Sequence, residues 1–154
     1  MKTNFIPDGY HTATPYLIVN GGTRAIEFYQ KAFGATEVLR VNAPGGKLGH
    51  AEIQIGDSRI MLADEFPEYD ARGPEAFGGT PVSLMLYLED VDAVVARAVS
   101  LGAKILKPVQ DQFYGDRSGT ILDPFGHKWT IATHIEDMSS EEMARRAAAM
   151  FEAK

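Results

Sequence analysis

The feature that most constrains the fold of this chain is an internal repeat. An apolar triplet at residues 17–19, a helix-like stretch and Gly34 recur in the same order as a triplet at 86–88, a second helix-like stretch and Gly102. Two copies are too few for a solenoid, which needs at least about three stacked units. The repeat therefore predicts two similar modules that pair with each other, with a site between the halves.

Each copy has the pattern β-α-β-β-β. Alternating apolar residues predict strands, helical spacing predicts one helix in each copy, and a glycine follows each helix as a typical stop. The expected strands cover 14–19, 36–41, 49–55, 59–64, 82–88, 104–107, 117–122 and 127–133. We therefore predict a single α+β domain, with module one at 12–64, a linker at 65–81 and module two at 82–134.

Two residues are expected to cap helices. Asp90 precedes a stripe of valines, and Ser139 with Glu142 forms the pattern of a capping box. The second cap predicts a C-terminal helix at 139–152. One face of that helix is apolar and needs a covering surface, either the domain itself or a partner subunit; it comprises Met143, Ala147, Met150 and Phe151.

Composition argues against several classes of function. The chain has no cysteine, which excludes disulfides, Cys-ligated zinc, iron–sulfur clusters and thiol catalysis. Its formal net charge of −6 argues against nucleic-acid binding, which needs a basic face. No apolar run approaches the ~20 residues of a membrane span, and the N-terminus lacks the apolar core of a signal peptide. We expect a cytoplasmic protein with neither a nucleic-acid nor a membrane partner.

The predicted strands have one apolar face and one mixed face. Successive side chains of a strand point to opposite sides, so Ala51, Ile53 and Ile55 are expected under a helix. The mixed face contains His50, Glu52 and Gln54 but also larger apolar side chains that do not suit open solvent, namely Tyr16, Leu62, Met85 and Tyr87. We expect this face to line a concave, semi-polar pocket.

Several sequence segments together resemble one family. These are residues 25–29, Phe33-Gly34-Ala35 and Asp123-Pro124-Phe125-Gly126-His127, in an order that spans roughly residues 12–134. They resemble the vicinal oxygen chelate superfamily, which contains glyoxalase I, bleomycin-resistance proteins, fosfomycin-resistance enzymes and extradiol dioxygenases; residues 51–64 and 111–117 are most similar to its PhnB-like branch. The resemblance implies a cupped mixed sheet with the helices on its convex side and a small-molecule site in the cup. We further predict a homodimer, with the linker and the terminal helix near the interface.

The metal ligands of that superfamily do not carry over. The family pattern takes one ligand from each of four strands, and these positions fall on Thr14, Leu62, Ser83 and Thr130. Hydroxyl and aliphatic side chains are poor ligands for divalent ions, so no cofactor is expected. A relocated site stays open as an alternative, with four candidate ligands: His50, Glu52, Asp64 and His134. The other reading of His50 and Glu52 is a polar wall of the cup.

The turn before the strand at 117 has two readings. Resistance proteins of the superfamily often have an aromatic-Gly pair here, which implies that Tyr114 stacks on a planar ligand while Arg117 pairs with its carboxylate or phosphate. The other reading is a hairpin tip with a surface salt bridge. His127, in a second turn, is interpreted as a surface residue.

Three functions fit these observations. The favoured one is a small-molecule binding protein of the glyoxalase and bleomycin-resistance type, without a metal. The alternatives are a divalent-metal-dependent lyase, isomerase, transferase or dioxygenase, and a metal-free enzyme with Glu52 as a base whose pKa burial raises. Whether the protein is an enzyme stays open. The expected ligand contacts are Tyr16, His50, Glu52, Leu62, Ser83, Met85, Tyr114, Arg117 and Thr130.

Overall fold

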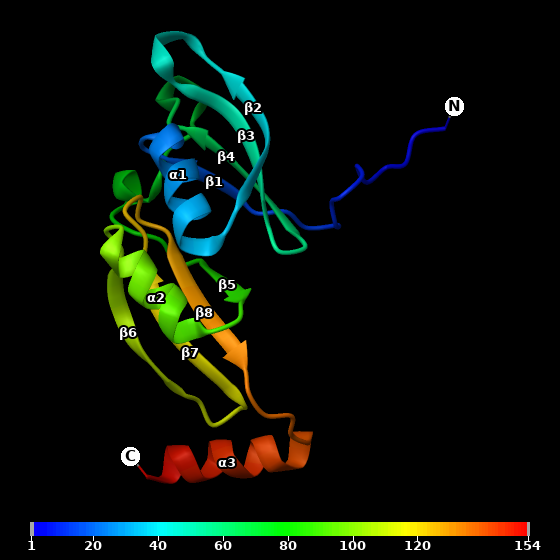
Figure 1. Ribbon diagram of the computed structural model, residues 1–154, viewed down its shortest axis with the longest axis vertical. Coiled ribbons are helices and arrows are strands. Elements are labelled where there is room, and N and C mark those ends of the chain that lie inside the picture. Colours follow the sequence, from blue (N-terminus) through cyan, green and yellow to red (C-terminus); the bar gives the residue numbers. More distant parts are fainter. Residues whose placement is uncertain (1, 154) are drawn as a thin grey trace. The chain divides into compact units, whose positions relative to one another are not determined.

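The computed structural model describes residues 2–153. Within them, the chain forms two four-stranded sheets, each with one helix against one of its faces, and a further helix near the C-terminus (Figure 1). The predicted α+β class and the duplicated β-α-β-β-β order are confirmed. None of the helices in this part of the chain is long and apolar enough to cross a membrane.

The first module is a mixed sheet with one helix. Its elements are β1 (Tyr16–Val19), α1 (Gly22–Phe33), β2 (Thr36–Asn42), β3 (Leu48–Ile55) and β4 (Ser58–Asp64), with a 3-10 turn at Pro44–Gly46. The strand order is β1-β4-β3-β2, and only the β1–β4 pair is parallel. Helix α1 ends at Gly34, whose left-handed conformation (φ 72°) carries no penalty in a residue without a Cβ.

The second module repeats this topology. Its elements are β5 (Ser83–Tyr87), α2 (Val91–Ser100), β6 (Lys104–Asp111), β7 (Asp116–Leu122) and β8 (Lys128–His134), in the order β5-β8-β7-β6 with β5 parallel to β8. As predicted, Asp90 caps α2, because its carboxylate accepts a hydrogen bond from the amide of Ala93 at 3.2 Å. Strand β6 continues past the predicted end at residue 107. Pro108 does not stop it, because an edge strand tolerates a missing amide hydrogen.

The helix-covered face of each sheet is the core. Ala51 and Ile53 of β3 are fully buried, as are Trp129 and Ile131 of β8. The predicted alternation of the strands is therefore confirmed at these positions. The opposite face of each sheet has no helix of its own module packed on it, and we call it the open face.

Equivalent side chains join the last strand to the start of the helix in both modules. The carboxylate of Asp64, at the end of β4, accepts hydrogen bonds from the amides of Gly21, Gly22 and Leu48 at 2.7–2.9 Å. At the end of β8 the hydroxyl of Thr133 accepts only one, from Val91 at 3.1 Å, and donates to the carbonyl of Leu88. These contacts fix where each helix begins over its sheet.

The linker is an ordered part of the first module. It contains two 3-10 helices, η2 (Pro67–Tyr69) and η3 (Pro74–Phe77), and two backbone hydrogen bonds between Phe66 and Ala71. The chain divides into two compact units. The first holds the residues up to Pro81 together with Pro124–His127; the second holds Val82–Asp123 and the chain from Lys128 onward.

The C-terminal helix α3 (Ser140–Glu152) is confirmed, together with its predicted cap. The hydroxyl of Ser139 accepts a hydrogen bond from the amide of Glu142 at 3.2 Å. None of the α3 residues is buried, and Met150 and Phe151 are 45% and 71% exposed. Within residues 2–153, the apolar face of α3 is therefore only partly covered.

Candidate functional site

The open face of the first sheet carries a hydrogen-bonded series of three predicted site residues. The hydroxyl of Tyr16, from β1, lies 2.8 Å from Nδ1 of His50 in β3, and Nε2 of His50 lies 3.3 Å from a carboxylate oxygen of Glu52. A carboxylate only accepts, so Nε2 carries a proton and donates it. In the tautomer with its proton on Nε2, His50 accepts at Nδ1, and Tyr16 is the donor there. The sheet register brings these groups together, since Tyr16 and Glu52 both pair with Met61 of β4.

Two further residues, Tyr10 and Arg59, lie near the Glu52 end of this series. The guanidinium of Arg59 lies over the ring of Tyr10 at 5.4 Å from its centroid and donates to the amide oxygen of Gln54 at 2.8 Å. The Tyr10 hydroxyl is inaccessible to solvent and has no hydrogen-bond partner within the described part of the chain. Sequence reasoning did not select Tyr10, because it precedes β1 in an irregular segment without periodicity.

The charges of the series are set by these neighbours. The Tyr10 hydroxyl near Glu52 holds the pKa of that carboxyl below its usual range, and His50 acts in the same direction; together they outweigh burial. The predicted rise in the Glu52 pKa is therefore wrong, because polar neighbours favour the ionised form more than burial disfavours it. Burial, with the added effect of the negative Glu52, raises the pKa of Tyr10 and of Tyr16.

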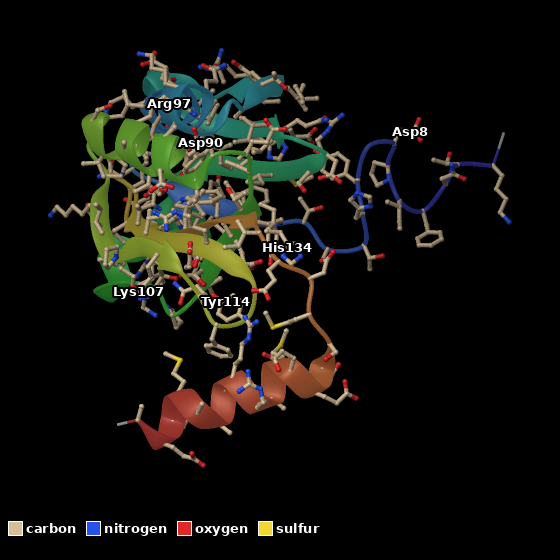
Figure 2. All side chains as sticks on the ribbon, turned by 60° about the horizontal axis from the view of Figure 1, so that its bottom comes forward. Asp8, Asp90, Arg97, Lys107, Tyr114 and His134 are labelled. Carbon is tan, nitrogen blue, oxygen red and sulfur yellow. The ribbon has the colours of Figure 1, made fainter. Side chains whose placement is uncertain are left out.

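The second unit has a different polar cluster, at one end of its sheet. The buried carboxylate of Asp116 accepts from the hydroxyl of Tyr87 at 2.9 Å and from Nδ1 of His134 at 2.7 Å. Nε2 of His134 lies 2.7 Å from Asp137. Both ring nitrogens donate to carboxylates, which requires the imidazolium. Asp116 first, and Asp137 next, raise the pKa of His134. Figure 2 labels His134 and Tyr114 at this end of the sheet.

Three more predicted contacts lie on strands of the second sheet. Met85 of β5, 46% exposed, pairs in register with Thr130 of β8, and the hydroxyl of Thr130 is 3.0 Å from that of Thr120 on β7. Ser83 begins β5 and is exposed. These side chains form a polar row beside a thioether.

Two predicted contacts lie on the helix-covered side instead. Leu62 is fully buried and pairs with the buried Leu17 of β1. Arg117 donates two hydrogen bonds to Asp92 of α2, at 2.7 and 2.9 Å, and one to Asp111 at 3.0 Å. Its guanidinium is thus committed to internal ion pairs, as in the salt-bridge reading of this hairpin. The Tyr114 ring packs edge-on against Phe113 in the preceding turn.

The metal-ligand positions of the family do not fit a divalent ion in this chain. Thr14 precedes β1, Leu62 is in the core, and Ser83 and Thr130 offer only hydroxyls. The alternative, relocated metal site is also unsuitable, because the carboxylate of Asp64 already accepts hydrogen bonds from three backbone amides. Across residues 2–153, no three His, Asp or Glu side chains are grouped so that they could hold a metal ion. The donor set is therefore unsuited to a divalent ion.

Two β-α-β-β-β modules of this topology define the glyoxalase type of fold. Residues 10–131 match the family model described as the Glyoxalase/Bleomycin resistance protein/Dioxygenase superfamily, and the chain belongs to that superfamily. An uncharacterized protein of Mycobacterium tuberculosis is 40% identical over 133 residues, which cover 84% of this chain and 78% of that protein.

Solved structures share the fold. That of the Arabidopsis thaliana gene product At5g48480 has a TM-score of 0.65 at 25% identity, and the match covers 80% of this chain and 98% of that one. A PhnB protein from Bacillus cereus has a TM-score of 0.59 at 20% identity, over 80% of this chain and 99% of that one. The predicted superfamily is confirmed, with a PhnB protein among its structural neighbours.

Proposed function

We propose that the protein binds a small organic molecule on the open face of its first sheet, in contact with Tyr16, His50 and Glu52. The observation that carries this proposal is their continuous hydrogen-bonded series on a face without a covering helix. The Tyr16 hydroxyl donates its one proton to His50 and keeps lone pairs that can accept, and Glu52, whose pKa is lowered, is a second acceptor. Exposed apolar side chains of β2, Leu39 and Val41, pair in register with Glu52 and His50 and flank the polar groups.

The proposed ligand follows from this arrangement. Ligand sites combine apolar walls with a few polar groups that fix orientation. A hydroxyl or amine of the ligand would donate to Glu52 or to the Tyr16 oxygen, which accepts because its one proton is donated to His50. The protein binds such a molecule without a metal, because its side chains at the metal-ligand positions of the family are hydroxyls and an aliphatic group.

Ligand screening tests this proposal. A library of small hydroxy and amino compounds is screened by thermal shift, and hits are mapped by amide chemical shifts. We expect the largest shifts at residues 16, 50 and 52, and at least about tenfold weaker binding in Glu52→Gln, since a hydrogen bond to a charged group contributes roughly 1.5–3 kcal/mol.

A matched variant controls for charge. Glu27→Gln removes the same charge from the exposed surface of α1 and should leave binding unchanged. Hits that map only to the second unit, or that bind Glu52→Gln and the native protein equally, would contradict the proposal.

A further inference from the structure

The linker of the first unit encloses a cleft beside the edge strand β1. Its volume is about 240 Å³, and its lining includes Tyr16 and Ile18 from β1, Arg72, Pro74 and Phe77 from the linker, and His127. All of these residues belong to the first unit. The cleft is separate from the Tyr16–His50–Glu52 series except for Tyr16, which borders both.

The walls of the cleft are held by specific contacts. The amide of Gly73 donates to the Glu65 carboxylate at 2.8 Å, and a Cβ on Gly73 would lie 3.1 Å from the carbonyl oxygen of Ile18. Gly126 (φ 91°) approaches Pro74 so closely that a Cβ would lie 2.9 Å from the proline ring. The linker thus packs on the edge strand at van der Waals distance, which makes the cleft a built feature.

The lining combines aromatic surface with one cation. Phe77 and Tyr16 are 71% and 49% exposed, although large aromatic side chains usually gain free energy from burial. Arg72 is the charged side chain of the lining, and its ion pair to Asp70 is long, at 3.8 Å, with Asp70 itself 92% exposed. An exposed pair of this length contributes little, so the guanidinium fork remains available to a planar anion.

The size and the donors select the kind of ligand. A cavity of about 150 Å³ holds a benzene ring, so this cleft has room for one ring with a carboxylate. Nε2 of His127 lies 2.9 Å from the carbonyl oxygen of Ile18 and must donate to it, because a carbonyl only accepts. That bond fixes the imidazole as part of the wall.

We propose that this cleft binds a small aromatic carboxylic acid, with the carboxylate on Arg72 and the ring against Phe77 and Tyr16. The proposal goes beyond the open-face site, since it uses a cation, Arg72, and a second aromatic residue, Phe77, that both come from the linker; only Tyr16 is shared. The exposed acids of the linker, among them Glu68 and Glu75, do not line the cleft, and salt screens them.

Benzoate is the probe for this proposal. Amide shifts of the full chain are followed during titration with benzoate, with benzyl alcohol and cyclohexanecarboxylate as matched probes that lack the charge or the aromatic ring. We expect saturable shifts around residues 72–81 and 127, and binding at least about tenfold weaker for either matched probe, because a charge-assisted fork and ring stacking both contribute.

Matched variants decide the outcome. Arg72→Gln should weaken benzoate binding about tenfold or more, whereas Arg145→Gln, an equal loss of charge on α3, should not change it. Glu52→Gln should also leave it unchanged, which separates this cleft from the open-face site. No saturable binding of benzoate, or equal binding in Arg72→Gln and Arg145→Gln, would overturn the proposal.

Discussion

The two modules share their framework but differ on their open faces. Both have the same strand order, the same parallel pair and a side chain of the last strand that holds the start of the helix. Yet His50 of the first module lies between a tyrosine hydroxyl and one carboxylate, whereas His134 of the second lies between two carboxylates as an imidazolium. The comparison shows that the repeated sequence pattern encodes the scaffold, and that the polar side chains on the open faces differ between the modules.

The largest expected effect concerns the scaffold that the two modules share. Asp64→Ala leaves three backbone amides without their acceptor. The amides of Gly22 and Leu48 are buried, at roughly 1–3 kcal/mol each, and that of Gly21 is part-buried, so we expect a loss of roughly 2–6 kcal/mol or more in the free energy of unfolding. Thr133→Ala removes one such bond and should cost roughly 1–2 kcal/mol. Urea denaturation compares the two. Equal losses would contradict the difference between the anchors.

The second prediction concerns α3, which has no counterpart in the first module. We predict a homodimer in which the apolar face of α3 is buried. Met150→Glu should then weaken dimerisation by at least about a hundredfold, since each of two copies loses the ~1.5–3 kcal/mol of a buried apolar side chain. Light scattering at micromolar concentration measures the mass. The control is Ala149→Glu, an equal charge on the exposed side of α3 away from its apolar face, and a monomeric native protein would refute the prediction.

The third prediction separates the open faces by pH. The folded pKa of His134 lies above its unfolded value, so its stabilising effect is complete below the unfolded pKa and is lost as pH rises through the folded one. Glu52 has a lowered pKa, so its effect is present above the unfolded pKa and is lost as pH falls through the folded one.

Stability measured across pH in two variants tests these opposite signs. His134→Gln should remove part of the alkaline loss of stability, and Glu52→Gln part of the acid loss. If His134→Gln changed the loss of stability at acid pH and Glu52→Gln the loss at alkaline pH, the assigned charge states would be wrong.

The smallest expected effect is that of adding or removing divalent metal ions. Neither module has a suitable ligand at the metal-ligand positions of the family. Three of these positions have hydroxyl side chains, Thr14, Ser83 and Thr130, and the fourth is the aliphatic Leu62. Dialysis against zinc, manganese or iron(II) should leave well below one ion per chain by elemental analysis, and a chelator should not move Tm. One tightly held ion per chain, lost in His50→Ala, would reverse this.

The sequence predicted the scaffold well because its signals are local. Gly34 as a helix stop, Asp90 and Ser139 as caps and the alternation in β3 depend on neighbouring residues, and all are confirmed. The end of β6 was missed because Pro108 normally breaks a strand, and only its place at the sheet edge allows it.

The site was less predictable because it depends on which way a side chain points. Leu62 and Arg117 were expected on the open face, but the register places them on the helix side, and a shift of one residue along a strand exchanges the two faces. His127 was interpreted as a surface residue, whereas it is part-buried and bonded to Ile18, a contact across 109 positions that no local pattern reveals. The Tyr10–Glu52 proximity escaped notice for the same reason.

The four residues Pro124–His127 have a consequence for how the protein is made. They come late in the chain but belong to the first unit, where the ring of Phe125 lies 6.3 Å from that of Phe28 and 6.2 Å from that of Tyr29. During translation, the first unit cannot complete its aromatic cluster until the ribosome has passed residue 127. A fragment cut after Pro81 would lack this ring, so the first copy of the repeat does not by itself contain all the side chains of its own core.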